Sequence, residues 1–221
     1  MKAATADKVR EIVQAHRDRT GSEEHVYLGR RVSISPQVFS PFIAPSGYLS
    51  FALSSLPLFT NKRILDVGCG AGIFASAVGS SGADRVVGID INEHAVNDAA
   101  GNAKALGVAR RTEFRQGSLF EPLERGELFD LVFADLPFTN GEPRDLLERA
   151  FYDKDLALIK EFMRGVPDRL NGPGAEVYLC ISDADHIKLG PLARAARLRY
   201  EPFIRVKLPW MQLFLLRMQR D

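Results

Sequence analysis

The chain has 221 residues, 46% of them apolar, which suits one α/β domain with a short addition. Its formal net charge of +1 provides no overall field that would favour nucleic acid or a membrane surface as a partner. No apolar run approaches the ~18 residues of a spanning helix, and the start at Met1 leads into a charged helix rather than an apolar leader.

Residues 1–60 are predicted to form an N-terminal cap that leans on the remainder of the chain. Apolar residues recur at helical spacing between about 5 and 19, which predicts an amphipathic helix. Apolar and polar residues alternate around a glycine over 26–41, as in a hairpin, and a short helix is expected over 47–56. These elements have too few apolar residues for a core of their own, so the main domain is expected over 61–221.

Strands and helices alternate regularly from Arg63 onward. This rhythm predicts an α/β fold with a mostly parallel seven-stranded sheet, right-handed crossovers and helices on both faces. The last two strands follow each other directly around Pro209–Trp210, so they should form an antiparallel C-terminal hairpin. The expected strands are 64–67, 85–90, 112–116, 129–134, 175–181, 202–208 and 211–218, and the main expected helices are 73–78, 92–106, 153–170 and 185–197.

The first strand of this domain leads into a glycine-rich turn, Asp66-Val-Gly-Cys-Gly-Ala-Gly72. A strand, a glycine turn and a helix are how α/β sheets build nucleotide sites. The dinucleotide fingerprint would need another glycine where Ile73 stands, and Asp66 would repel a pyrophosphate at the helix N-terminus. The turn therefore suits a ligand that has a cationic amino-acid part and no phosphate.

This turn resembles the first motif of the class I S-adenosylmethionine-dependent methyltransferases. The resemblance implies a Rossmann-like sheet, S-adenosylmethionine as the cofactor and S-adenosylhomocysteine as the product. It also implies that Asp66 helps to hold the methionine end of the cofactor. The backbone of Gly68, Cys69 and Gly70 would then lie along the cofactor.

The ends of the next two strands supply further candidate cofactor contacts. Asp90 ends the second strand, where an acid can bind both hydroxyls of a ribose. The alternative role for it is to cap the helix that starts just after it. Ile91 would offer an apolar face to the adenine. After the third strand the related enzymes often carry Gly-Asp-Leu, with the Asp reaching the adenine amino group. Here Ser118 stands at that position, and its hydroxyl or the backbone of Leu119 is expected to make this contact.

Asp135-Leu-Pro-Phe138 follows the fourth strand and resembles the Asn/Asp-Pro-Pro-Tyr/Phe motif of methyltransferases that act on planar nitrogens. The lone pair of a planar NH₂ group is delocalised, so acceptors for its two hydrogens must direct that lone pair towards the methyl donor. Asp135 and the Leu136 carbonyl are the expected acceptors. Pro137 stiffens the loop, and Phe138 would stack on the acceptor plane.

The sequence leaves the methyl acceptor open. Gln37–Pro41 resembles a segment that forms a lip over the cofactor in release-factor glutamine methyltransferases and in small-subunit ribosomal RNA guanine methyltransferases. The front region here has a single helix, no RNA-binding domain is recognised, and Leu136 replaces the first proline of the motif. We therefore predict an N-methyltransferase acting on a small metabolite. The alternative is a protein glutamine or ribosomal RNA enzyme, and a non-catalytic cofactor-binding relative is a third possibility.

Three further features bear on partners and location. Cys69 and Cys180 lie in the glycine turn and in an apolar strand, which fits a reduced, cytoplasmic protein without disulfides. The four histidines are scattered singly, so no metal site is expected. Basic residues outnumber acids after His186, which is typical of a solvated face and less often of a polyanion-binding surface. These residues are Lys188, Arg194, Arg197, Arg199, Arg205, Lys207, Arg217 and Arg220.

Overall fold

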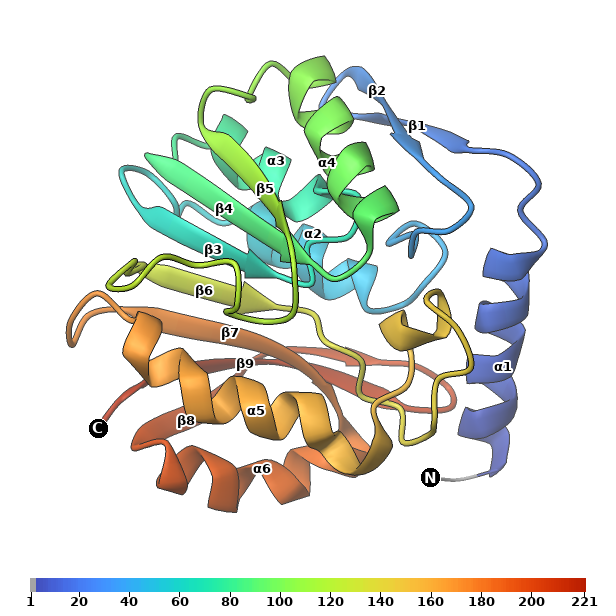
Figure 1. Cartoon of the computed structure of the whole chain (residues 1–221). Coiled ribbons are helices and arrows are strands. Elements are labelled where there is room, and N and C mark those ends of the chain that lie inside the picture. The colour runs from blue at the N-terminus through green and yellow to red at the C-terminus, as the bar shows by residue number, and fades with distance from the viewer. Residues whose placement is uncertain (1–2) are drawn as a thin grey trace.

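A seven-stranded sheet forms the centre of the computed structural model, which describes residues 3–221 (Figure 1). Its strand order is β5-β4-β3-β6-β7-β9-β8, and β9 runs antiparallel to its two neighbours while the other adjacent pairs are parallel. The predicted fold class is therefore confirmed. The strands are β3 (Arg63–Val67), β4 (Arg85–Asp90), β5 (Thr112–Gln116), β6 (Leu131–Ala134), β7 (Glu176–Ser182), β8 (Leu198–Lys207) and β9 (Gln212–Arg220).

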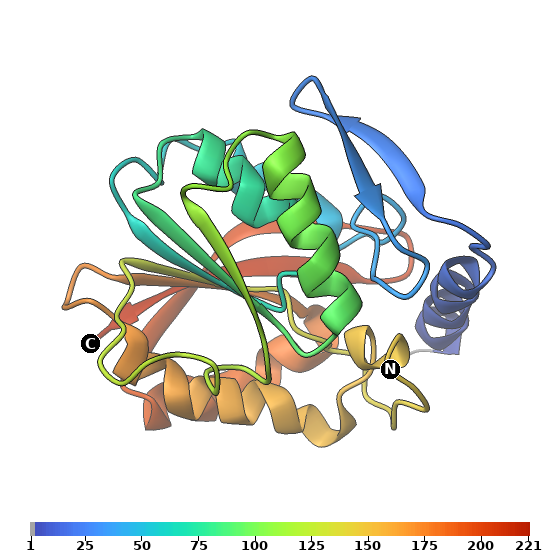
Figure 2. The ribbon, with the colours of Figure 1, turned by 45° about the horizontal axis from the view of Figure 1, so that its top comes forward.

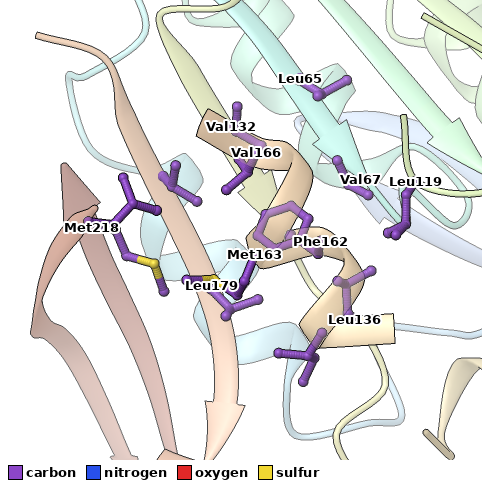
Figure 3. Close-up of a cluster of buried hydrophobic side chains, with 14 of the residues drawn as sticks. Leu65, Val67, Leu119, Val132, Leu136, Phe162, Met163, Val166, Leu179 and Met218 are labelled. Atoms are coloured by element: carbon purple, nitrogen blue, oxygen red, sulfur yellow. The ribbon is translucent and has the colours of Figure 1, made fainter. Parts of the chain in front are cut away.

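Both faces of this sheet are covered, because the parallel strands are apolar on both sides. Ile64 and Leu65 on β3 belong to different apolar clusters. The Leu65 cluster contains Phe162 and Met163, and Figure 3 shows these side chains between the sheet and the helix above it. The helices on this face are α5 (Ala157–Gly165) and α6 (Asp183–Ala195), and those on the other face are α2 (Gly47–Ser54), α3 (Ile73–Ser80) and α4 (Glu93–Ala105).

The N-terminal segment packs along the outside of this layered structure. It consists of α1 (Ala3–Arg17) and a hairpin of β1 (Glu23–Tyr27) and β2 (Arg30–Ile34). The hairpin lies beside α4 (Figure 2), where Asn102 accepts the Ser33 N–H at 2.8 Å and donates to the Ser33 carbonyl at 2.9 Å. The side-chain amide of Asn102 thus pairs with the backbone of Ser33 on the edge of β2 that faces away from β1.

Three predicted elements differ from the structure. The expected helix over 153–170 is instead a 3₁₀ turn (Lys154–Leu156), α5 and a second 3₁₀ turn (Val166–Arg169). The Asp153 carboxylate accepts the Leu158 and Ile159 N–H groups, which starts α5 late, and Pro167 lies in the turn that follows it.

The predicted hairpin over 26–41 is shorter and begins earlier, at Glu23. Its second strand ends at Ile34 because Asp98 accepts both the backbone N–H and the hydroxyl of Ser35, each at 2.7 Å. Similarly, the strand expected from Phe129 begins at Leu131, and Phe129 forms a single bridge to Leu170.

No helix within residues 3–221 combines the length and apolar character needed to cross a bilayer. Residues 1 and 2, on which the expectation of no leader peptide partly rests, lie outside the described residues. Cys69 and Cys180 are free and buried. A search of the described side chains finds no group of three or more that is arranged to hold a metal ion.

Candidate functional site

A cavity of about 380 Å³ lies at the carboxyl edge of β3, β4 and β6. Every residue that the sequence nominated for cofactor or acceptor contact lines it. These are Asp66, Gly68, Cys69, Gly70, Asp90, Ile91, Ser118, Leu119, Asp135, Leu136, Pro137 and Phe138. The fold therefore brings residues from four separate segments of the chain together at one place.

Backbone hydrogen bonds tie the glycine turn to the neighbouring strand β4. The N–H groups of Gly68 and Cys69 both donate to the Ile89 carbonyl, at 2.8 and 3.0 Å. Gly68 has a φ of +76°, and a Cβ there would lie 3.3 Å from the carbonyl oxygen of Asp135. The turn thus needs glycine both for its conformation and for the close approach of the loop after β6.

Asp90 supports the same turn from the neighbouring strand. One carboxylate oxygen accepts the Gly70 N–H at 2.9 Å, and the other accepts the Asn92 N–H at 2.9 Å. Helix α4 is capped by Asn92, whose side chain accepts the His94 N–H at 3.0 Å, so Asp90 is not the cap. Each oxygen of Asp90 retains acceptor capacity towards the cavity, as a ribose-binding acid requires.

Asp66 is a buried acid that forms no ion pair with any of the described residues. It is 1% exposed, and its Oδ2 atom has no hydrogen-bond partner among the described residues. Burial, together with the charges of Asp90 and Asp135, raises its pKa well above the usual range. An unpaired buried carboxylate oxygen is costly, so the arrangement fits a ligand that brings a cationic amino group. The residues present therefore fit S-adenosylmethionine.

The loop after β6 presents Asp135 to the same cavity. Burial raises the pKa of this carboxyl to about 6, and hydrogen bonds from Ser46 and Cys180 oppose the rise. The Leu136 side chain is 4% exposed and packs in the apolar core with Leu119 and Phe162 (Figure 3). The leucine that replaces the motif's first proline is thus explained by packing.

Helix α1 forms an outer wall of the cavity that the sequence did not predict. Val9 and Ile12 line the cavity, and the helix is fastened at three places. The Thr5 hydroxyl donates to the Trp210 carbonyl at 2.7 Å, and Arg17 donates to Glu148 at 2.8 Å. His16 accepts the Ser40 N–H at 3.0 Å. The apolar stripe of this helix was visible in the sequence, but its position over the cavity was not.

His16 joins α1 to the segment after β2. It is fully buried, its Nδ1 donates to the Ile12 carbonyl at 2.8 Å, and its ring stacks on Phe39 with centroids 5.4 Å apart. With Nδ1 donating and Nε2 accepting, the ring is neutral. Burial lowers its pKa, in agreement with this bonding.

The C-terminal basic residues do not gather at the cavity. Arg217 pairs with Glu201, and Arg205 lies over the Phe214 ring. None of the eight basic residues after His186 lines the cavity. The register of β7 and β9 pairs Arg217 with Tyr178, near the start of β7 and away from the site.

Several known proteins are similar to this chain in sequence. A model described as a methyltransferase domain matches residues 58–187. A release factor glutamine methyltransferase of Aliivibrio fischeri is 37% identical over 102 residues, which are 45% of this chain and 36% of that protein. A putative protein N5-glutamine methyltransferase of Methanocaldococcus jannaschii is 34% identical over 110 residues, which are 50% of this chain and 52% of that protein.

Solved structures share the fold at low identity. The T. thermophilus 16S rRNA N2 G1207 methyltransferase, solved with AdoMet and guanosine, superposes with a TM-score of 0.66 at 19% identity, covering 90% of this chain and 50% of that one. A ribosomal protein L11 methylase of Lactobacillus delbrueckii has a TM-score of 0.64 at 17% identity, over 83% of this chain and 82% of that one. The matched region spans about a third of the length of the Aliivibrio fischeri relative and about half of the Methanocaldococcus jannaschii relative. The matched domain covers more than half of the sequence, and the chain therefore belongs to the family of class I S-adenosylmethionine-dependent methyltransferases.

Proposed function

We propose that this protein transfers a methyl group from S-adenosylmethionine to the side-chain amide nitrogen of a glutamine in a protein. The observation that carries the proposal is the convergence of Asp66, Asp90 and Asp135 on one cavity beside the glycine turn. The first two acids suit the cofactor, and the third, with its loop, suits a planar NH₂ group. The metabolite acceptor expected from the sequence has less support than its alternative, because the similar proteins include two kinds of glutamine methyltransferase.

The cofactor, when bound, supplies a methyl group on a cationic sulfur. The Asp135 carboxylate and the Leu136 carbonyl would accept the two hydrogens of the amide NH₂ and turn its lone pair towards that methyl group. Phe138 would stack against the amide plane. The nitrogen would become acidic as it gains the methyl group and the donor sulfur would keep the electron pair of the broken bond, so Asp135, or water, would accept the proton that the nitrogen releases.

A protein acceptor is favoured over RNA by the charges of the cavity. Among the described residues that line it, Arg149 is the one basic side chain, beside four aspartates, Asp66, Asp90, Asp135 and Asp153. RNA binding draws its affinity from several phosphate contacts with Lys and Arg. Such a lining does not provide those contacts, whereas an amide side chain needs none.

The proposal includes a division of the chain into two parts. We assign residues 1–60 to a cap and residues 61–221 to the methyltransferase domain. Val9 and Ile12 on α1 line the cavity, so the cap would form part of the acceptor site.

The test is methyl transfer from radiolabelled S-adenosylmethionine to candidate acceptors. Glutamine-containing protein fragments, RNA hairpins with unpaired guanines and small amides are offered in parallel, with Asp135→Ala as the inactive control. Recovery of labelled N-methylglutamine after digestion supports the proposal. Label in RNA or in small amides alone would replace the protein acceptor, and no cofactor binding below the millimolar range would overturn the proposal altogether.

A further inference from the structure

The loop from Thr139 to Asp153 forms one side of the cavity mouth, and most of its charged residues are neutralised. Glu142 pairs with Lys154 at 2.6 Å, and Asp145 pairs with Arg17 at 2.6 Å. Glu148 is buried and takes hydrogen bonds from both Arg144 and Arg17. The two pairs with Arg17 fasten the loop to α1, and three of the four acids of the loop, Glu142, Asp145 and Glu148, have a basic partner.

Arg149 differs from these neighbours. Its side chain is exposed, lines the cavity, and forms no hydrogen bond or ion pair with any described residue. Its backbone is fixed in a 3₁₀ turn, where its N–H donates to the Asp145 carbonyl at 3.3 Å. A guanidinium with a fixed base and an unused fork of donors is suited to a carboxylate.

The surroundings restrict what this guanidinium can bind. The deep aspartates, Asp66 and Asp90, lie beside the glycine turn, where the cofactor is expected, and Arg149 belongs to the mouth loop with Leu146, which is 40% exposed. A charge at the mouth of a cleft is focused by the low-dielectric walls around it. It acts first on whatever enters from the solvent.

From this placement we propose that Arg149 binds an acidic side chain next to the methylated residue and so selects acceptor proteins with an Asp or Glu beside the target. The inference rests on the proposed function and names the substrate class more closely. A single lining cation matches one carboxylate and does not match the repeated phosphates of RNA. Leu146 would pack on the apolar part of the same peptide segment.

The first experiment measures binding without catalysis. Fluorescent peptides of one length, each with a single glutamine flanked by Asp, Asn or Lys, are titrated by anisotropy into protein saturated with S-adenosylhomocysteine. We expect the Asp peptide to bind at least tenfold more tightly than the Asn peptide, and the Lys peptide to bind most weakly. Arg149→Gln should bring all three within about twofold, and Arg149→Glu should reverse the order.

The matched control is Arg110→Gln, which removes an exposed arginine with no side-chain partner among the described residues and away from the cavity. It should keep the wild-type order. An unchanged order in Arg149→Gln overturns the inference. A tenfold loss of S-adenosylhomocysteine affinity in that variant also overturns it, since Arg149 would then hold the cofactor carboxylate. Loss of binding to an oligouridylate, with no effect on the peptides, would assign Arg149 to phosphate instead.

Methyl transfer to the same peptides separates the inference from the proposed function. The Asp peptide should show a lower KM than the Asn peptide at a similar kcat, and Arg149→Gln should raise that KM about tenfold. Binding with the expected order but no methylation of any peptide would refute glutamine methylation while leaving acid recognition intact. Methylation that does not depend on the flanking charge would refute acid recognition by Arg149 while leaving glutamine methylation intact.

Discussion

The protonation state of Asp135 leads to a prediction about both activity and stability. Burial raises the pKa of this carboxyl from its ordinary 3.8 to about 6. The ionised carboxylate is a stronger acceptor for one N–H of the NH₂ group than the protonated carboxyl, and only the ionised form can take up the proton that methylation releases. With a pKa of about 6, roughly a tenth of it is ionised at pH 5, so kcat/KM should fall about tenfold between pH 7 and pH 5.

The substitution Asp135→Asn tests this reasoning. An amide oxygen accepts hydrogen bonds at every pH in this range, so the variant should retain part of the activity and lose the acid limb near pH 6. The ratio kcat/KM is the quantity to follow, because it reports the groups of the free enzyme. A flat wild-type profile from pH 5 to pH 8, or the same limb in Asp135→Asn, would refute the assignment.

The same substitution should change stability in a defined direction. Between pH 3.8 and about 6 the folded protein binds more protons at Asp135 than the unfolded chain, so stability falls as pH rises through this window and stays lower above it. Each pH unit corresponds to about 1.4 kcal/mol, so ionised Asp135 costs about 3 kcal/mol at pH 7. Urea unfolding should show Asp135→Asn to be more stable by up to that amount at pH 7, and much less so at pH 4. Asp84→Asn, at an exposed carboxyl, is the control and should change little. A loss of stability at pH 7 would contradict the burial argument.

Three further predictions follow from other contacts. Asp90→Ala should weaken S-adenosylhomocysteine binding at least about tenfold in calorimetry, because the Gly70 and Asn92 N–H groups lose their acceptor and the ribose loses its expected one. Asp135→Ala should leave that affinity within about threefold. Equal losses in the two variants would contradict separate roles for the two acids. His16→Phe should lower the free energy of unfolding, measured with a chemical denaturant at pH 8, by about 1–3 kcal/mol, because the Ser40 N–H and the Ile12 carbonyl lose their partner. Since burial lowers the pKa of His16 below the unfolded value of 6.5, the wild type loses stability as pH falls below 6.5 and this variant should lose less. Gly72→Ala should lower the free energy of unfolding by more than about 2 kcal/mol, because the residue has a φ of +71° and a new Cβ would lie 2.7 Å from the Cβ of Ala99. Gly101→Ala, whose new Cβ meets open space, should be neutral or stabilising. Similar losses of stability in both variants would contradict the packing argument.

Local patterns in the sequence were sufficient for the sheet and for half of the site. The order of apolar strands and helices predicted the parallel sheet, because burial on both faces makes each strand continuously apolar. The turn from Asp66 to Gly72 and the acid at Asp90 were recognisable because their chemistry depends on residues close together in the chain. The same locality explains the wrong helix over 153–170, where the Asp153 side chain competes for backbone groups that periodicity alone assigns to a helix.

The remaining half of the site depends on contacts between distant segments. Ser46 and Asp135 line the same cavity although 89 positions of sequence separate them, and His16 accepts the Ser40 N–H. No short-range pattern encodes such pairs. The sequence by itself determined the fold, and it was enough to propose the glycine turn as the cofactor site and Asp135–Phe138 as the acceptor loop, since each is a property of a continuous segment. Only the tertiary structure placed α1 over the cavity and left Asp66 and Arg149 without a charged partner among the described residues, because charge balance and enclosure depend on which segments meet in space.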